Sequence, residues 1–141
     1  MKTKGFTIIE LLITITIIGV LATLTIVFLR PQILKARDAK RKSNINEIQT
    51  ALEEYLTDNG CYPATGAVTC TPGNYLAPYL RKIQCDPEGG SYEYTSETTS
   101  CPSWYRIFAI LENIKDPSVS PGIGPGGMYN YSAGSTNALP L

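Results

Sequence analysis

The sequence predicts an α+β protein in which one long N-terminal helix packs on a small antiparallel sheet. Three observations support this fold class. A 24-residue apolar run, residues 6–29, contains a single ionisable side chain, Glu10. An amphipathic helical pattern follows this run directly, without an intervening loop pattern. Two short segments of alternating pattern, residues 91–96 and 103–113, lie in the cysteine-containing C-terminal part.

The apolar run is long enough to cross a membrane. As a helix it would extend about 36 Å, and a bilayer hydrocarbon core is about 30 Å thick. A charge at mid-bilayer costs roughly 2.5–3.5 kcal/mol, but Glu10 lies about one turn from the polar end, where the cost is smaller. The simplest interpretation is a single-pass anchor or an uncleaved signal peptide whose glutamate reaches the headgroups.

The helical pattern continues beyond the apolar run and predicts one helix over residues 6–58. Its apolar stripe steps by three, four and three residues, and its members are Ile45, Ile48, Leu52 and Tyr55. Asn59-Gly60 is a suitable end, because both residues tolerate the left-handed conformation that caps helices. Pro31 lacks a backbone donor and predicts a bend or an interruption just past the apolar run.

The two alternating segments predict a β-hairpin. The second, residues 103–113, places four apolar residues on one face, and this face should pack on the helical stripe; these residues are Tyr105, Ile107, Ala109 and Leu111. Residues 128–131 predict one further short strand. Residues 61–90 form a Pro- and Gly-rich loop with a short helical turn within 74–83.

The four cysteines predict two disulfides in an oxidising compartment, because their number is even and the C-terminal part is small. The spacings x8, x14 and x15 include no C-x-x-C pair, and the chain has no histidine, so a zinc site is not expected. Three pairings are possible. The local one, Cys61–Cys70 with Cys85–Cys101, is favoured, and free buried thiols are the alternative.

Charge is unevenly distributed along a chain of zero net charge. Residues 30–42 hold six basic residues and one acidic residue, a net of +5, whereas the chain from Ser43 onward holds four basic and ten acidic residues, a net of −6. The positive-inside rule alone would place residues 30–42 in the cytoplasm. The cysteines favour the opposite orientation. The basic cluster 35–42 is better explained by headgroup contact, or by a solvated face that complements acidic heads of neighbours, than by nucleic-acid binding.

The N-terminal boundary Lys4-Gly5-Phe6, followed by Glu10 in an apolar helix, resembles the start of a type IV prepilin or type II secretion pseudopilin. The similarity covers about the first 30 residues. It implies a pilin-like fold, with a cleaved leader, a transmembrane or filament-core helix, an amphipathic helix that forms the spine of the head, and a globular head. The corresponding segments are 1–5, 6–30, 31–59 and 60–141.

The resemblance also implies a processing pathway. A prepilin peptidase would cut between Gly5 and Phe6, the new amine of Phe6 would be methylated, and Glu10 would pair with the Phe6 amine of a neighbouring subunit. The partners implied are other pilin subunits, the peptidase and methyltransferase, an inner-membrane assembly platform and, before assembly, the bilayer. The implied place is the bacterial inner membrane, with the head outside the cytoplasm, and then a cell-surface filament.

Catalytic chemistry is not predicted. The chain lacks histidine, the commonest general base, and the carboxylates Asp86 and Glu88 flank Pro87 in a loop where such pairs are usually solvated. No carboxylate side chain follows Asp116, so the calcium loop of major secretion pseudopilins is not carried over, and neither a metal nor a cofactor is expected. The alternative function is a membrane-tethered extracytoplasmic binding or adhesion module that does not polymerise, with nine tyrosines to supply a surface.

Overall fold

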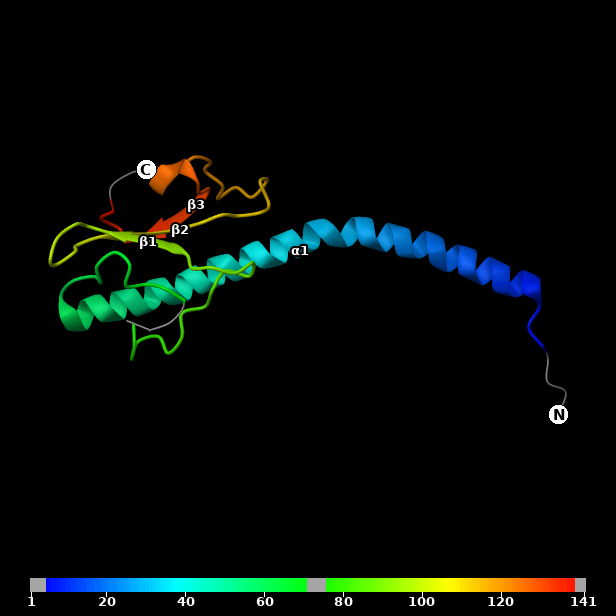
Figure 1. The fold of residues 1–141 in the computed structure, drawn as a ribbon, viewed down its shortest axis with the longest axis horizontal. Helices are drawn as coiled ribbons and strands as arrows, with labels where there is room; N and C mark the ends of the chain where they lie inside the picture. The colour runs from blue at the N-terminus through cyan, green and yellow to red at the C-terminus, as the bar shows by residue number, and fades with distance from the viewer. Residues whose placement is uncertain (1–4, 71–75, 139–141) are drawn as a thin grey trace. The chain divides into compact units, whose positions relative to one another are not determined.

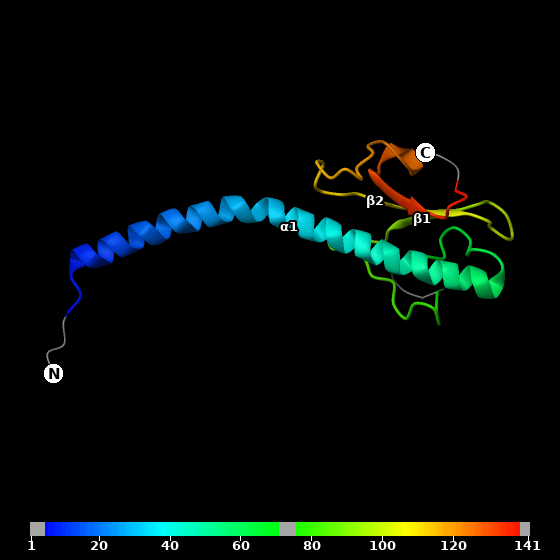
Figure 2. The same ribbon diagram turned by 180° about the vertical axis from the view of Figure 1, so that it is seen from behind.

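A computed structural model describes residues 5–70 and 76–138 (Figures 1 and 2). In order, the elements are α1 (Ile8–Asn59), β1 (Glu93–Ser96), β2 (Tyr105–Ala109), the 3-10 helix η1 (Pro125–Gly127) and β3 (Tyr131–Gly134). The contacts divide the chain into two compact units, with the division between Leu34 and Lys35. The predicted α+β class is confirmed, and each unit is described by itself.

The first unit carries the apolar part of α1. Every large hydrophobic side chain from Phe6 to Leu29 is exposed, with exposed fractions between 49% and 85%. Within the described residues, α1 is the only helix long and apolar enough to cross a membrane. The threonine hydroxyls are satisfied inside the helix, because Thr14, Thr16, Thr23 and Thr25 each donate to a carbonyl one turn earlier at 2.8 Å. The surface therefore suits lipid or another apolar helix.

α1 runs through Pro31 without a break, so of the two predicted effects, a bend or an interruption, the interruption is wrong. Proline in a helix interior costs about 3 kcal/mol through one lost hydrogen bond and a ring clash. Helix formation is cooperative, and the turns on both sides of Pro31 are already formed, so one lost bond does not end a 52-residue helix.

The core of the second unit lies between α1 and the sheet (Figure 1). The sheet has the order β1-β2-β3, and both pairs are antiparallel. The predicted helical stripe and the predicted face of β2 meet, since both belong to one cluster of buried residues. Its central members are Ile45, Ile48, Leu52, Tyr105, Ile107 and Ala109, each at most 4% exposed.

The third strand lies further along the chain than predicted, at Tyr131–Gly134 rather than at 128–131. Asn130 explains the shift, because its side chain accepts from Leu111 N at 2.6 Å and donates to Leu111 O at 2.9 Å. The backbone N of Asn130 also donates to Ala109 O at 3.3 Å, so these side-chain bonds lie where backbone pairing with β2 begins. β3 then runs close to β2, where a Cβ on Gly134 would lie 2.5 Å from Tyr105 O.

The two disulfides are Cys61–Cys101 and Cys70–Cys85, so the favoured local pairing is wrong. The chain contains β1 between Cys85 and Cys101, and an extended strand separates the residues on its two sides. The loop after α1 instead meets the end of the hairpin turn, where Tyr62 N donates to Pro102 O at 2.9 Å. The described residues contain no free cysteine.

The bridge that closes the longer loop should contribute more to stability. Cys61–Cys101 spans 40 residues and Cys70–Cys85 spans 15. Replacing both residues of the first bridge with alanine should lower the free energy of unfolding by about 2–4 kcal/mol, and the same change in the second by less. Urea unfolding in detergent, followed by the fluorescence of Trp104, measures both. An equal or larger loss from the second bridge would contradict the prediction.

Candidate functional site

The start of α1 is shaped by a reciprocal capping interaction. Thr7 Oγ1 accepts a hydrogen bond from Glu10 N at 3.2 Å, and the Glu10 carboxylate accepts from Thr7 N at 3.5 Å and from Thr7 Oγ1 at 3.4 Å. This is the arrangement of a capping box, for which the sequence signal is a threonine followed three residues later by glutamate. Within the described residues, no basic side chain pairs with Glu10. Sequence reasoning treated Glu10 only as a charge and missed its capping role.

Gly5 and Phe6, on either side of the predicted cleavage site, are not packed against other described residues. Phe6 is 76% exposed, and a Cβ placed on Gly5 would meet no atom within 4 Å. The backbone at Gly5 does not have a positive φ either. Packing and conformation of the described residues therefore do not explain why position 5 is glycine.

In the second unit, Arg41 forms the centre of a buried ion cluster. Its guanidinium binds both oxygens of Asp86, at 2.6 and 2.9 Å, and also contacts Asp38 at 2.9 Å and Glu112. Asp38 in turn accepts from the backbone N of Glu112 and Asn113, at 2.9 and 2.8 Å. The cluster ties α1 to the loop before β1 and to the segment after β2. The prediction that Asp86 is merely solvated is wrong.

Charge within this cluster shifts the pKa values of its members. Hydrogen bonding to Asp86 raises the pKa of Arg41 in spite of burial. Burial favours the neutral form of Asp86, but the hydrogen bonds from Arg41 and from the backbone of Glu88 are stronger and lower the pKa of this carboxyl. Arg41 is only 2% exposed, so the carboxylates around it replace the water that it loses on folding.

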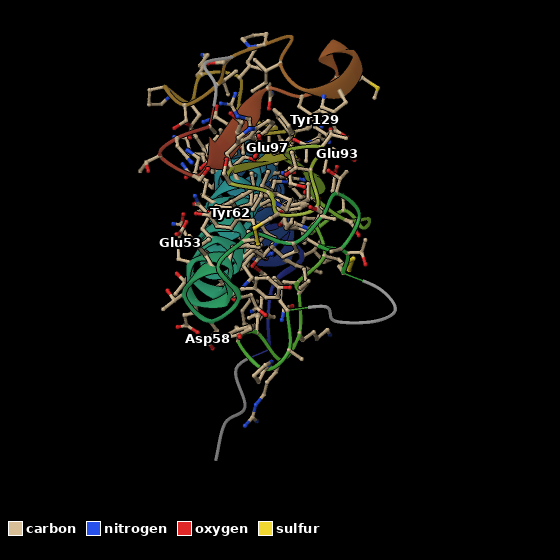
Figure 3. The ribbon with its side chains drawn as sticks, turned by 90° about the vertical axis from the view of Figure 1, so that its left-hand side faces the viewer. Glu53, Asp58, Tyr62, Glu93, Glu97 and Tyr129 are labelled. Carbon is tan, nitrogen blue, oxygen red and sulfur yellow. A yellow bond between two sulfur atoms is a disulfide. The ribbon has the colours of Figure 1, made fainter. Side chains whose placement is uncertain are left out.

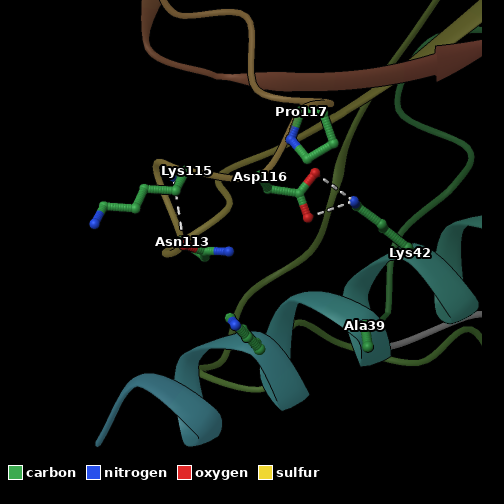
Figure 4. Close-up of a pocket in the computed structure, with 7 residues that line it drawn as sticks. Ala39, Lys42, Asn113, Lys115, Asp116 and Pro117 are labelled. Carbon is green, nitrogen blue, oxygen red and sulfur yellow. Dashed lines mark hydrogen bonds and ion pairs between the residues drawn. The ribbon is translucent and has the colours of Figure 1, made fainter.

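Two more members of the basic cluster 35–42 bind within the head. Arg37 contacts Glu88 at 2.7 Å and Glu112 at 3.1 Å. Lys42 Nζ lies 2.8 Å from both oxygens of Asp116 and 3.1 Å from Ser118 Oγ, beside an open hollow (Figure 4). The prediction of a wholly solvent- or headgroup-facing basic cluster is therefore wrong for Arg37, Arg41 and Lys42.

The tyrosines belong mainly to the interior of the head. Tyr62 donates to both oxygens of Glu53, at 3.1 and 3.0 Å (Figure 3). Tyr105 donates to the same carboxylate at 3.4 Å. Burial and the bond to Glu53 raise the pKa of Tyr62 to about 12. Among the described tyrosines none is exposed, so the aromatic surface that an adhesion module would need is missing from this part of the chain.

Comparison with known proteins agrees with these features. Residues 1–26 match the prokaryotic N-terminal methylation motif, and residues 29–110 match the family described as type II secretion system (T2SS), protein G. The type II secretion system core protein G of Pseudomonas aeruginosa is 33% identical over 114 residues, covering 70% of this chain and 78% of that protein. The protein of the same name from Escherichia coli K12 is 36% identical over 102 residues, covering 64% and 70%. No solved structure matches significantly.

These matches decide between the predicted functions. The family is structural and not enzymatic, and the non-polymerising binding module is not favoured. The described residues also contain no group of three or more His, Cys, Asp or Glu side chains that would hold a metal ion. With its N-terminal methylation motif, its apolar helix and its small disulfide-bonded head, the chain belongs to the type II secretion system protein G family, whose members are pseudopilins.

Proposed function

We propose that the chain is inserted in the bacterial inner membrane through residues 6–30, cut between Gly5 and Phe6, methylated on Phe6 and assembled into the secretion filament. Residues 31–59 are then the spine of the head, which residues 60–141 complete. The head lies outside the cytoplasm, where its two disulfides persist. The partners are other pseudopilins, the prepilin peptidase and methyltransferase, and the inner-membrane assembly platform.

The observation that carries this proposal is an exposed apolar segment of α1 whose one carboxylate, Glu10, has no cationic partner among residues 5–70 and 76–138. The side chains from Phe6 to Leu29 are exposed and suit lipid first and neighbouring helices later. Among packed neighbouring helices, Glu10 needs a cationic partner, because a buried unpaired charge is costly. Cleavage supplies that cation as the free amine of Phe6, which methylation leaves charged.

Intact-mass measurement of the membrane-extracted chain tests the processing. The expected mass lacks residues 1–5 and carries one added methyl group on Phe6. A Gly5→Val variant is the matched control, since the fold leaves room for a side chain at position 5. It should insert and form both disulfides but stay uncut. A wild-type chain recovered uncut from cells that hold an active prepilin peptidase would contradict the proposal.

A further inference from the structure

Three exposed charges form a line along α1 in the second unit. Lys40, Glu47 and Glu54 are spaced by seven residues, or about two helical turns, so they lie on one side of the helix. All three are solvent-exposed, and none forms a hydrogen bond or an ion pair with any residue that the structure describes. We call these three residues the charged stripe. Its basic member lies toward the N-terminus and its acidic members toward the C-terminus.

The stripe differs from the other charges of this part of α1. Arg37, Asp38, Arg41 and Lys42 are all bound to residues beyond α1 in the second unit. Lys35 is also exposed and unpaired in the described structure, but it lies about 140° around the helix from Lys40. The stripe is thus a separate surface whose opposite charges have no partner among the residues that the structure describes.

Spacing prevents the stripe from pairing with itself within one chain. Residues seven apart are separated by about 10.5 Å along the helix axis, whereas side-chain pairs on one helix form at spacings of three or four residues. Parallel copies displaced by about 10.5 Å would instead place Lys40 of one copy at the same height along the axis as Glu47 of the next. A displacement of about 21 Å would place Lys40 level with Glu54.

We infer that the charged stripe is a contact between copies of this chain, in which Lys40 of one subunit pairs with Glu47 of its axial neighbour. The inference rests on the proposed function, because insertion in one membrane makes neighbouring copies parallel. The contact is heterologous and does not close, so it repeats along a filament. Residues beside the stripe are small or hydroxyl-bearing and permit close approach; they include Ala36, Ser43 and Thr50, all exposed.

Charge reversal tests the pairing. Lys40→Glu and Glu47→Lys should each lower the yield of sheared filaments severalfold, and the combined variant should restore it. Lys35→Glu is the matched control and should leave the yield unchanged, because Lys35 lies off the stripe. A wild-type yield from Lys40→Glu would overturn the inference, as would a loss that the combined variant does not recover. An equal loss from Lys35→Glu would also overturn it, in favour of headgroup binding by basic residues in general.

Cysteine cross-linking gives a second, independent measurement. In a Lys40→Cys/Glu47→Cys chain the new cysteines are about 10.5 Å apart, which is beyond the roughly 7 Å limit for a disulfide, so any bond joins two chains. Oxidised filaments should give a ladder of multimers on a non-reducing gel. Lys35→Cys/Glu47→Cys should give none. Filaments that form without the ladder would overturn the inference alone, whereas a correctly processed wild-type chain that forms no filament would overturn the proposed function.

Discussion

A Glu10→Ala chain should insert in the membrane and fold its head but form few filaments. In a dry core of packed helices, the Phe6 amine of a neighbouring subunit needs a carboxylate. Removing one partner of a buried ion pair costs about 3–5 kcal/mol, which weakens each subunit contact by roughly 10²- to 4 × 10³-fold. Microscopy and quantification of sheared filaments measure the loss, and membrane fractionation with disulfide mapping checks that the monomer is intact.

Two further variants separate charge from capping. Glutamine also closes a capping box, so Glu10→Gln keeps the bonds with Thr7 and removes only the charge. Thr7→Val removes the hydroxyl and keeps the charge. If Glu10 acts as an ion, Glu10→Gln should fail to assemble and Thr7→Val should assemble nearly normally. The reverse pattern would show that Glu10 serves only to begin the helix.

An Arg41→Met chain should lose about 3–5 kcal/mol of its free energy of unfolding. The change leaves Asp38, which is 2% exposed, without its cation, and it removes the bidentate partner of Asp86, whereas Glu112 keeps its contact with Arg37. Methionine retains much of the volume of the arginine stem, so the loss reports charge rather than a cavity. Urea unfolding of the detergent-solubilised chain, followed by Trp104 fluorescence, measures it.

Arg37→Met is the matched control for this prediction. Arg37 also contacts Glu112 and lies one turn earlier on α1, but its side chain is 39% exposed. Exposed ion pairs contribute about 0–1 kcal/mol, so Arg37→Met should change stability by no more than that. Similar losses in the free energy of unfolding from Arg37→Met and Arg41→Met would mean that burial does not determine how much the Arg41 cluster contributes to stability.

Periodic patterns explain most of what the sequence predicts correctly. The stripe through Ile45 and Ile48, and the alternation through Tyr105 and Ile107, each define a buried face from neighbouring residues alone. The helix end at Asn59 also follows from local residue preferences. The N-terminal motif is contiguous for the same reason, so the family was recognisable from the first residues of the chain.

Features that depend on distant residues were missed. The disulfide pairing is set by where the chain returns after β1, and shortness of a loop is a poor guide to that path. The same limit applies to Asp86 and Arg41, which are 45 residues apart in sequence and form a bidentate pair. Each looks like an ordinary surface charge in its own segment. The capping box of Thr7 and Glu10 has a recognisable sequence signal. It was not predicted, because a charge in an apolar helix was explained only by headgroup contact or by pairing with a neighbouring subunit.

In the precursor, the capping box holds Glu10 in an interaction with Thr7 of its own chain. Before the bond between Gly5 and Phe6 is cut, the nitrogen of Phe6 is a neutral amide and has no charge to offer a carboxylate. Glu10 Oε2 meanwhile accepts hydrogen bonds from the backbone N and the hydroxyl of Thr7, so one carboxylate oxygen has partners within its own chain. In the proposed pathway, proteolysis creates the stronger, charged donor in a neighbouring chain. In this pathway an uncut chain would lack the charged amine that Glu10 of a neighbour needs, so unprocessed chains would stay separate until the peptidase has acted.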